Sequence, residues 1–90
     1  MISLVKKLMV EFLGTIIFLG VILNTGKALP IGIALASVIY FGGDISGGHF
    51  NPAVTIMMLA NNKISFIEAI TYIVTQILGG LCVLRFIKRL

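Results

Sequence analysis

Three long apolar stretches, each bounded by charged residues, limit what this chain can fold into. Of its 90 residues, 59% are hydrophobic and 11% are charged, and the mean hydropathy is +1.16. An average soluble chain has about 45–50% apolar and about 25% charged residues. A chain this short buries too little surface to hide so many apolar side chains from water, so lipid must cover them. This composition excludes a disordered tail, a basic nucleic-acid module and a disulfide scaffold.

The three stretches predict an all-α membrane protein that crosses the bilayer more than once. The spans are expected over residues 7–26, 28–43 and 65–84. A helix rises about 1.5 Å per residue, so each stretch nearly covers a hydrocarbon core of about 30 Å. A basic start followed by an apolar run also resembles a signal peptide. However, Glu11 interrupts the first run and no small-residue cleavage site follows it, so we expect a retained helix.

Residues 44–62, between the second and third spans, predict a re-entrant segment. The segment contains a glycine-rich run at 46–48, which is a poor helix interior. Asn51 and Pro52 then form a favoured N-cap and first helical residue. The apolar residues 53–60 that follow cover only about 13 Å as a helix. Irregular backbone at membrane depth is tolerated only where it is buried in protein or lines a wet cavity, which already suggests a pore.

Ten consecutive residues of this segment resemble a family motif. They are Ser46-Gly47-Gly48-His49-Phe50-Asn51-Pro52-Ala53-Val54-Thr55. The run resembles the first signature of the aquaporin family, the membrane channels for water and small neutral solutes. Residues 11–15 resemble the family's first-helix signature, and Gln76 with the glycines at 79–80 resembles its third. The resemblance covers essentially the whole chain, which corresponds to the first half of a family member. Since such a member has six spans and two half-helices in two inverted repeats, residues 1–90 are expected to form one repeat.

The residue types of the motif suit the passage of neutral solutes. A half-helix that begins at mid-membrane presents unpaired N–H groups and about half a positive charge there. Two such ends facing each other repel cations and protons but not neutral molecules. The Asn51 amide can donate to a passing oxygen, and the carbonyls of Gly47, Gly48 and His49 can accept along the path. This passage needs no covalent chemistry, cofactor or metal, so we expect a passive channel rather than an enzyme.

Each candidate side chain also has a structural interpretation. Asn51 can be an N-cap only, and His49 can be an interior histidine whose hydrogen bonds are satisfied, but the resemblance favours both as pore-lining residues. Glu11, a carboxylate within a span, is a functional candidate by default. The resemblance instead implies that it accepts hydrogen bonds from the loop backbone and that Gln76 does the same. The glycines are expected to let helices approach closely, at positions 14, 32, 43, 79 and 80.

The expected constriction of the pore departs from the family pattern. The family's second signature carries an arginine directly after Asn-Pro-Ala, whereas Val54 follows Ala53 here. Ile31 stands where family constrictions usually have an aromatic residue. The predicted pore-lining residues are Gly47, Gly48, His49, Asn51, Pro52, Ala53, Val54, Ile31 and Ile39. In a pore of two identical copies, the constriction would be formed by Ile31, Ile39, Gly48 and Val54. Such a ring predicts a wider, more apolar passage for glycerol-sized solutes, or poor conduction.

The basic residues predict little preference for one orientation in the membrane. One face is expected to carry Lys6, Lys7 and Lys63, and the other Lys27, Arg85, Lys88 and Arg89. Three against four is almost no bias, and such a bias normally fixes orientation. Two oppositely oriented copies would reproduce the inverted repeat as an antiparallel dimer. No basic stripe interleaved with aromatic residues indicates a nucleic-acid partner, and the lone Cys82 allows no intrachain disulfide.

Two other functions remain open at this stage. A half-channel that does not conduct could associate with a full-length aquaporin and modulate it, or be a remnant of one. A small proton-coupled exporter would use Glu11 and the dual topology, but it does not account for the Asn-Pro-Ala loop.

Overall fold

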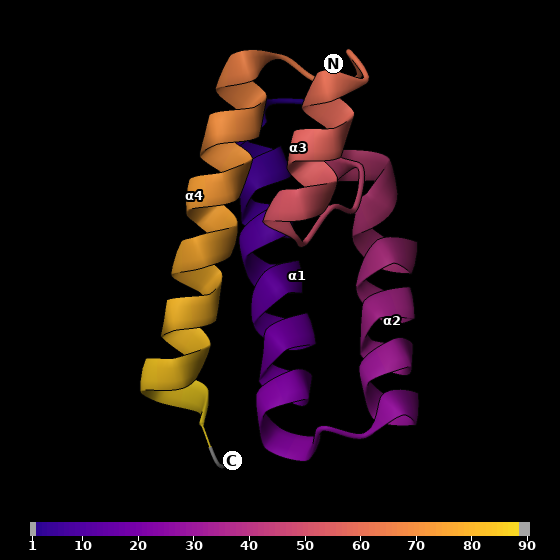
Figure 1. The fold of residues 1–90 in the computed structure, drawn as a ribbon, viewed down its shortest axis with the longest axis vertical. Helices are drawn as coiled ribbons and strands as arrows, with labels where there is room; N and C mark the ends of the chain where they lie inside the picture. The colour runs from indigo at the N-terminus through magenta and orange to yellow at the C-terminus, as the bar shows by residue number, and fades with distance from the viewer. Residues whose placement is uncertain (1, 89–90) are drawn as a thin grey trace.

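Four α-helices and one π-helical turn make up the fold in this computed structural model, which describes residues 2–88 and contains no strand among them (Figure 1). The elements are α1 (Leu4–Thr25), α2 (Ala28–Ser46), α3 (Pro52–Ala60), α4 (Phe66–Cys82) and the π-helical η1 (Val83–Ile87). α1 lies between α2 and α4 and packs along both, while α3 packs against α4. The bundle is 36 Å long, which is comparable to the thickness of a bilayer core.

Three segments are long and apolar enough to cross a membrane: Leu4–Thr25, Ala28–Ser46 and Phe66–Ile87. α3 has only nine residues, so it reaches about 13 Å and cannot cross. Figure 1 shows that it descends from one end of the bundle and that its N-terminus lies near the middle. The predicted class, an all-α membrane protein of three spans and one half-helix, is confirmed.

The helix ends differ from the expected spans by a few residues. α1 begins at Leu4 rather than at residue 7, because the Ser3 side chain accepts the N–H of Lys6 and caps the helix there. α2 continues to Ser46 rather than ending at 43, so residues 44–46 belong to this helix and not to the loop. Gly47 stops it with a left-handed backbone at φ 93°, a conformation that glycine adopts readily.

α4 ends in a region that the apolar pattern did not distinguish from the rest of the helix. Its last turn widens into the π-helical η1, which runs from Val83 to Ile87. The Asn24 side chain of α1 donates to the carbonyl oxygens of Gly20 and Ile87, at 2.8 and 3.3 Å. The bond to Gly20 lies within α1, and the bond to Ile87 ties the end of the third span to the end of the first.

Small residues matter at two kinds of contact. A Cβ atom at Gly79 would lie 3.3 Å from the Thr15 Cβ, and one at Gly80 would lie 3.2 Å from Leu19, so both glycines let α4 approach α1. Gly14 faces the ring of Phe50 from the loop instead of a helix. The expectation of close helix approach is therefore wrong at 14, and also at 32 and 43, where no other helix within residues 2–88 comes within 4 Å of a Cβ.

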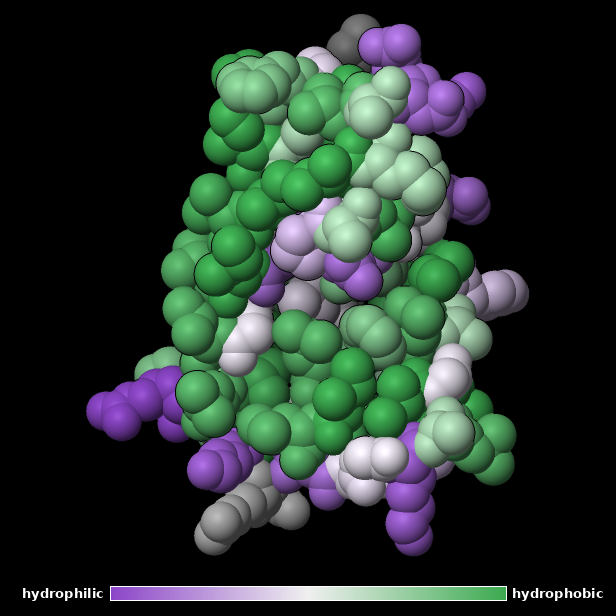
Figure 2. All heavy atoms as spheres, in the orientation of Figure 1, coloured by the Kyte–Doolittle hydropathy of each residue, from purple (hydrophilic) through white to green (hydrophobic). Residues whose placement is uncertain are grey.

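The interior of this bundle is more polar than its surface. Large apolar side chains are exposed along all the helices, and Figure 2 shows them covering most of one face. The buried polar side chains are Glu11, Thr15, Ser46, His49, Thr55 and Gln76. A soluble protein shows the reverse pattern, since it excludes unpaired polar groups from its core. Lipid solvates this exterior, and the polar residues gather around the loop between α2 and α3.

The fit of Phe50 against Gly14 gives a test of the fold. The ring is 2% exposed and would overlap a methyl group at Gly14. We expect Gly14→Ala to lower the free energy of unfolding by about 1–3 kcal/mol, as overpacking usually does. Gly32→Ala is the control, because no atom of the described residues lies within 4 Å of a Cβ there. Thermal unfolding in detergent compares the two variants, and equal melting temperatures would contradict this packing.

Candidate functional site

The loop between α2 and α3 enters the bundle through an unusual run of backbone angles. Gly47 and Gly48 have φ of 93° and 68°, and Phe50 has φ of 53°, which is uncommon for a residue with a side chain. The chain then becomes extended at Asn51 and α3 begins at Pro52. The Asn51 Oδ1 accepts the Ala53 N–H at 2.8 Å, and proline at the first helical position has no N–H to satisfy. The sequence thus fixes where the half-helix begins.

The Glu11 carboxylate of α1 holds this loop in place. It is fully buried and accepts the backbone N–H of His49 at 3.1 Å and that of Phe50 at 2.8 Å. It also accepts the Ser46 hydroxyl at 2.7 Å and the Gln76 Nε2 at 2.8 Å. An ionised carboxylate has about four acceptor positions, and four donors fill them here. The carboxylate therefore satisfies the buried N–H groups of His49 and Phe50 and joins the loop to α1, α2 and α4.

Gln76 was expected to accept hydrogen bonds from the loop backbone, but its side chain acts as a donor instead. Its Nε2 donates to Glu11 and, at 3.0 Å, to the Thr55 hydroxyl of α3, and it does not accept a bond from the loop backbone. Its Oε1 is buried and has no partner among the described residues. The loop backbone has no unpaired N–H left for this oxygen to accept at His49 or Phe50, because Glu11 already accepts both.

Sequence reasoning placed Ser46 and Thr55 in the motif without giving them a role and did not name Tyr72, yet all three are buried at the site. Thr55 contacts the His49 Nδ1 at 2.8 Å. The Tyr72 hydroxyl donates to the Ser46 carbonyl at 2.5 Å, and its ring lies 5.0 Å from the His49 ring. Tyr72 precedes Gln76 by four residues and so shares its helix face. That spacing was the signal in the sequence that could have identified it.

The predicted pore-lining residues are only partly brought together. Asn51 and Ala53 are exposed at the tip of the loop, while Pro52 and Val54 are half-buried beside it. Ile39 lies against the loop, since a Cβ at Gly48 would be 3.5 Å from its Cγ1. Ile31 stands two turns earlier on α2, about 12 Å farther along the helix. In Figure 2, pale and purple side chains form a small polar area in the middle of a green face.

A cavity of about 580 Å³ opens at the end of the bundle where α1 begins. Its walls come from all four helices and include Lys7, Asp44, Lys63 and Glu68. Gly47 and His49 of the loop also line it. The cavity therefore connects the charged end of the bundle with the buried polar residues of the loop.

Comparison with known proteins assigns the chain to a family. Residues 1–90 match the family model of the major intrinsic proteins. The chain belongs to this family. Membership confirms the resemblance noted in the sequence and the prediction of a multi-pass integral membrane protein. Members of the family are channels, so the prediction that the chain is not an enzyme is confirmed as well.

Named relatives are similar to most of this major intrinsic protein. Glycerol uptake facilitator protein-like 6 from Lactiplantibacillus plantarum is 45% identical over 92 residues, which cover 92% of this chain and 43% of that protein. Aquaporin Z from Photorhabdus laumondii is 46% identical over 56 residues, covering 62% of this chain and 24% of that protein. Aquaporin-5 from Homo sapiens is 35% identical over 92 residues, covering 89% and 35%. The chain thus spans less than half the length of these relatives.

Replacing Glu11 tests whether its carboxylate holds the site together. Glu11→Gln leaves one acceptor oxygen and puts an NH₂ group against two of the four donors. We expect the free energy of unfolding to fall by about 3–5 kcal/mol, as for other broken buried charge networks. Thermal unfolding in detergent measures this loss.

Glu68→Gln is the matched control for that variant. Glu68 is partly exposed, pairs with the Lys7 Nζ at 2.9 Å and caps α4 through Ser65. Glutamine can keep the cap, and an exposed ion pair contributes about 0–1 kcal/mol. If the two variants lost the same stability, Glu11 would not be the organising group.

Proposed function

We propose that this chain is one repeat of a passive channel for water and small neutral solutes such as glycerol. A second copy in the opposite orientation completes the pore, and each copy supplies one Asn51 at its centre. The passage runs along the loop carbonyls and the tip of α3. The residues that line it are Gly47, Gly48, His49, Asn51, Pro52, Ala53, Val54, Ile31 and Ile39.

The observation that carries this proposal is a polar tip on an apolar face at half depth. Asn51 is exposed there, and its Nδ2 has no acceptor among residues 2–88. The N-terminus of α3 adds the positive end of its helix dipole at the same place. Lipid tails cannot bond to these groups, and a bilayer tolerates them only against protein or a wet cavity. A pore formed with a second repeat provides both.

The electrostatics of the tip favour neutral solutes. Residues 47–60 carry no charged side chain. The N-terminus of α3 places about half a positive charge at mid-depth, which repels cations and protons. The exposed Asn51 amide offers a donor to the oxygen of water or of an alcohol. A solute can therefore exchange hydrogen bonds along the passage without a charged group to hold it.

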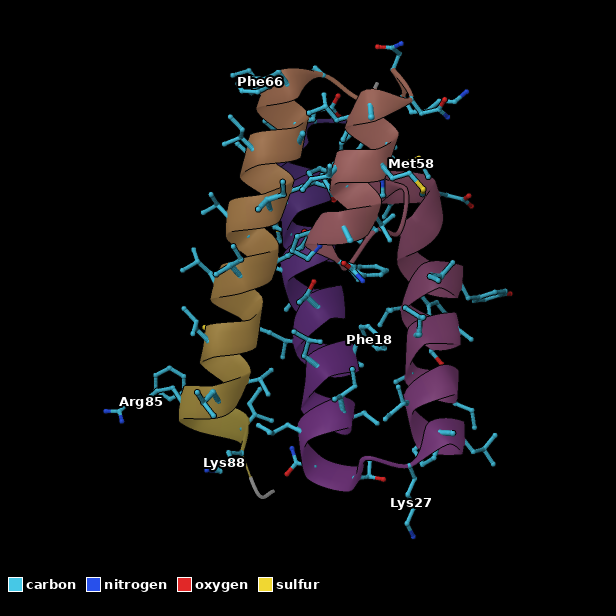
Figure 3. The ribbon with its side chains drawn as sticks, viewed as in Figure 1. Phe18, Lys27, Met58, Phe66, Arg85 and Lys88 are labelled. Atoms are coloured by element: carbon cyan, nitrogen blue, oxygen red, sulfur yellow. The ribbon has the colours of Figure 1, made fainter. Side chains whose placement is uncertain are left out.

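Assembly with an inverted copy is supported by the charges at the two ends. Lys27, Arg85 and Lys88 lie at one end of the bundle (Figure 3). Lys7 and Lys63 line the cavity at the other end, and Lys6 is next to them in the sequence. Similar numbers of basic residues at both ends give little preference for either orientation. Arg89, which was expected with the first group, lies outside the described residues.

The residue types at the predicted constriction support passage of solutes larger than water. Ile39 lies against Gly48 of the loop, Val54 lies in the first turn of α3, and Ile31 lies about two turns earlier on α2 than Ile39. None of these side chains is aromatic or charged, so two copies would form an apolar ring. One relative is named a glycerol uptake facilitator and others are named aquaporins, which supports both solute classes.

Stopped-flow light scattering on vesicles that carry the purified protein tests the proposal. Under a sorbitol gradient, we expect the vesicles to shrink faster than protein-free vesicles. Under a glycerol gradient, we expect fast shrinkage followed by re-swelling as glycerol enters. Rates equal to those of protein-free vesicles in both gradients would reject a channel and favour the half-channel that does not conduct.

Two asparagine variants separate conduction from folding. Asn51→Asp keeps a good N-cap but removes the amide donor from the tip. We expect melting to change little and permeability to fall about fivefold, as expected for about 1 kcal/mol added to the barrier. Asn61→Asp is the control, because Asn61 ends α3 far from the tip. Unchanged permeability in Asn51→Asp would contradict a solute contact at this side chain.

A further inference from the structure

We propose that a directed chain of hydrogen bonds from Glu11 sets the protonation of the His49 ring. The chain runs through Gln76 and Thr55 and leaves His49 neutral, with its proton on Nε2. This Nε2–H then faces the end cavity as a donor to the oxygen of a permeating solute. Gln76 and Thr55 act as positioning residues in this arrangement.

The direction of this series of hydrogen bonds is set first at Glu11, by backbone groups that can only donate. The backbone N–H groups of His49 and Phe50 donate to the two oxygens of Glu11. The Ser46 hydroxyl accepts the Gly48 N–H at 3.1 Å, and of the two acceptors for its own proton, Glu11 at 2.7 Å lies much closer than the Gly42 carbonyl at 3.5 Å. Glu11 is thus an acceptor at both oxygens, as an ionised carboxylate must be.

Gln76 carries this direction across to α3. Its amide nitrogen must face Glu11, because an amide oxygen there would oppose the carboxylate. One N–H goes to Glu11 at 2.8 Å, and the second goes to the Thr55 Oγ1 at 3.0 Å. Both protons of the amide are therefore used, and Thr55 receives one of them.

The Thr55 hydroxyl then has one proton to donate and one acceptor for it among the described residues. Its hydroxyl has two partners in the described chain, the Gln76 Nε2 and the His49 Nδ1 at 2.8 Å. A hydroxyl can accept two bonds, but Gln76 donates here, so the Nδ1 is the only partner among residues 2–88 that can accept the buried Thr55 proton. An imidazole nitrogen that accepts carries no proton, so the neutral ring holds its proton on Nε2.

The Nε2 side of the ring faces the cavity. His49 and Gly47 both line it, and a Cβ at Gly47 would lie 3.3 Å from the His49 Nε2. The residue is only 6% exposed, yet no hydrogen-bond partner is found for its Nε2 within residues 2–88. A donor held at a cavity wall without a partner is available to a molecule inside the cavity.

This donor selects for solutes by their hydrogen-bonding groups. Water and hydroxyl compounds offer an oxygen acceptor to the Nε2–H. An ammonium ion has only donors and finds no acceptor on this ring. The use of the donor rests on the proposed channel, whereas the position of the proton does not depend on conduction.

Nitrogen NMR of the imidazole tests the inference, and the chain has a single histidine, so the spectrum contains one ring. The protein is labelled with ¹⁵N-histidine and placed in lipid at about pH 8.5, where an ordinary imidazole is neutral. We expect a protonated Nε2 and an unprotonated Nδ1 that is shifted by the bond from Thr55. A protonated Nδ1 in the unmodified protein would overturn the proposal.

Threonine variants test whether Thr55 is the donor. Thr55→Val should move the Nδ1 resonance to the position of a nitrogen without a hydrogen bond, and Thr55→Ser should restore it. Thr71→Val is the matched control, because the Thr71 hydroxyl bonds only to carbonyl oxygens of its own helix. An Nδ1 resonance that Thr55→Val leaves unmoved would overturn the chain of bonds. Should that variant not fold, the proton position in the unmodified protein still tests the proposal.

Discussion

A single buried carboxylate organises this membrane repeat. The loop between α2 and α3 brings backbone N–H groups into the bundle, where lipid and apolar side chains cannot bond to them. Glu11 accepts two of these groups and also binds Ser46 of α2 and Gln76 of α4. Since the four partners belong to the loop, α2 and α4, the carboxylate fixes the depth of the loop and hence the start of α3. The charge is tolerated because its acceptor positions are filled.

The same arrangement leaves the repeat incomplete by itself. The inside of the loop is satisfied by Glu11 and by the packing of Phe50 against Gly14. The outside, where Asn51 is exposed and α3 begins, faces outward at half the depth of the helices. The surrounding surface is apolar and suited to lipid, whereas this small area is not (Figure 2). That contrast is the physical reason to propose a second repeat, with a water-filled pore between the two repeats.

The sequence predicted the elements better than the contacts between them. Hydropathy identified the three spans, and Asn51 followed by Pro52 located the start of α3. The run past residue 43 to Ser46 was missed, because the glycines there suggested a loop while tertiary bonds to Ser46 favour the helix. The buried place of Phe50 depends on a positive φ and on two other helices, and no local pattern encodes it. The hydrogen bond from Thr55 to His49 joins residues that are six apart in sequence, but its direction depends on Gln76, which lies 21 residues beyond Thr55.

Cross-linking between copies tests the central claim, that two inverted repeats meet at their loop tips. In a Cys82→Ala background, Ala53→Cys places a thiol on the exposed tip, and Asn61→Cys places one at the end of the bundle. In an antiparallel pair, only positions near mid-depth meet their own counterparts, and a disulfide needs Cα atoms about 4.4–6.8 Å apart. We predict an oxidised dimer for Ala53→Cys in membranes and none for Asn61→Cys. A dimer through Asn61→Cys, or no dimer through Ala53→Cys, would contradict the account.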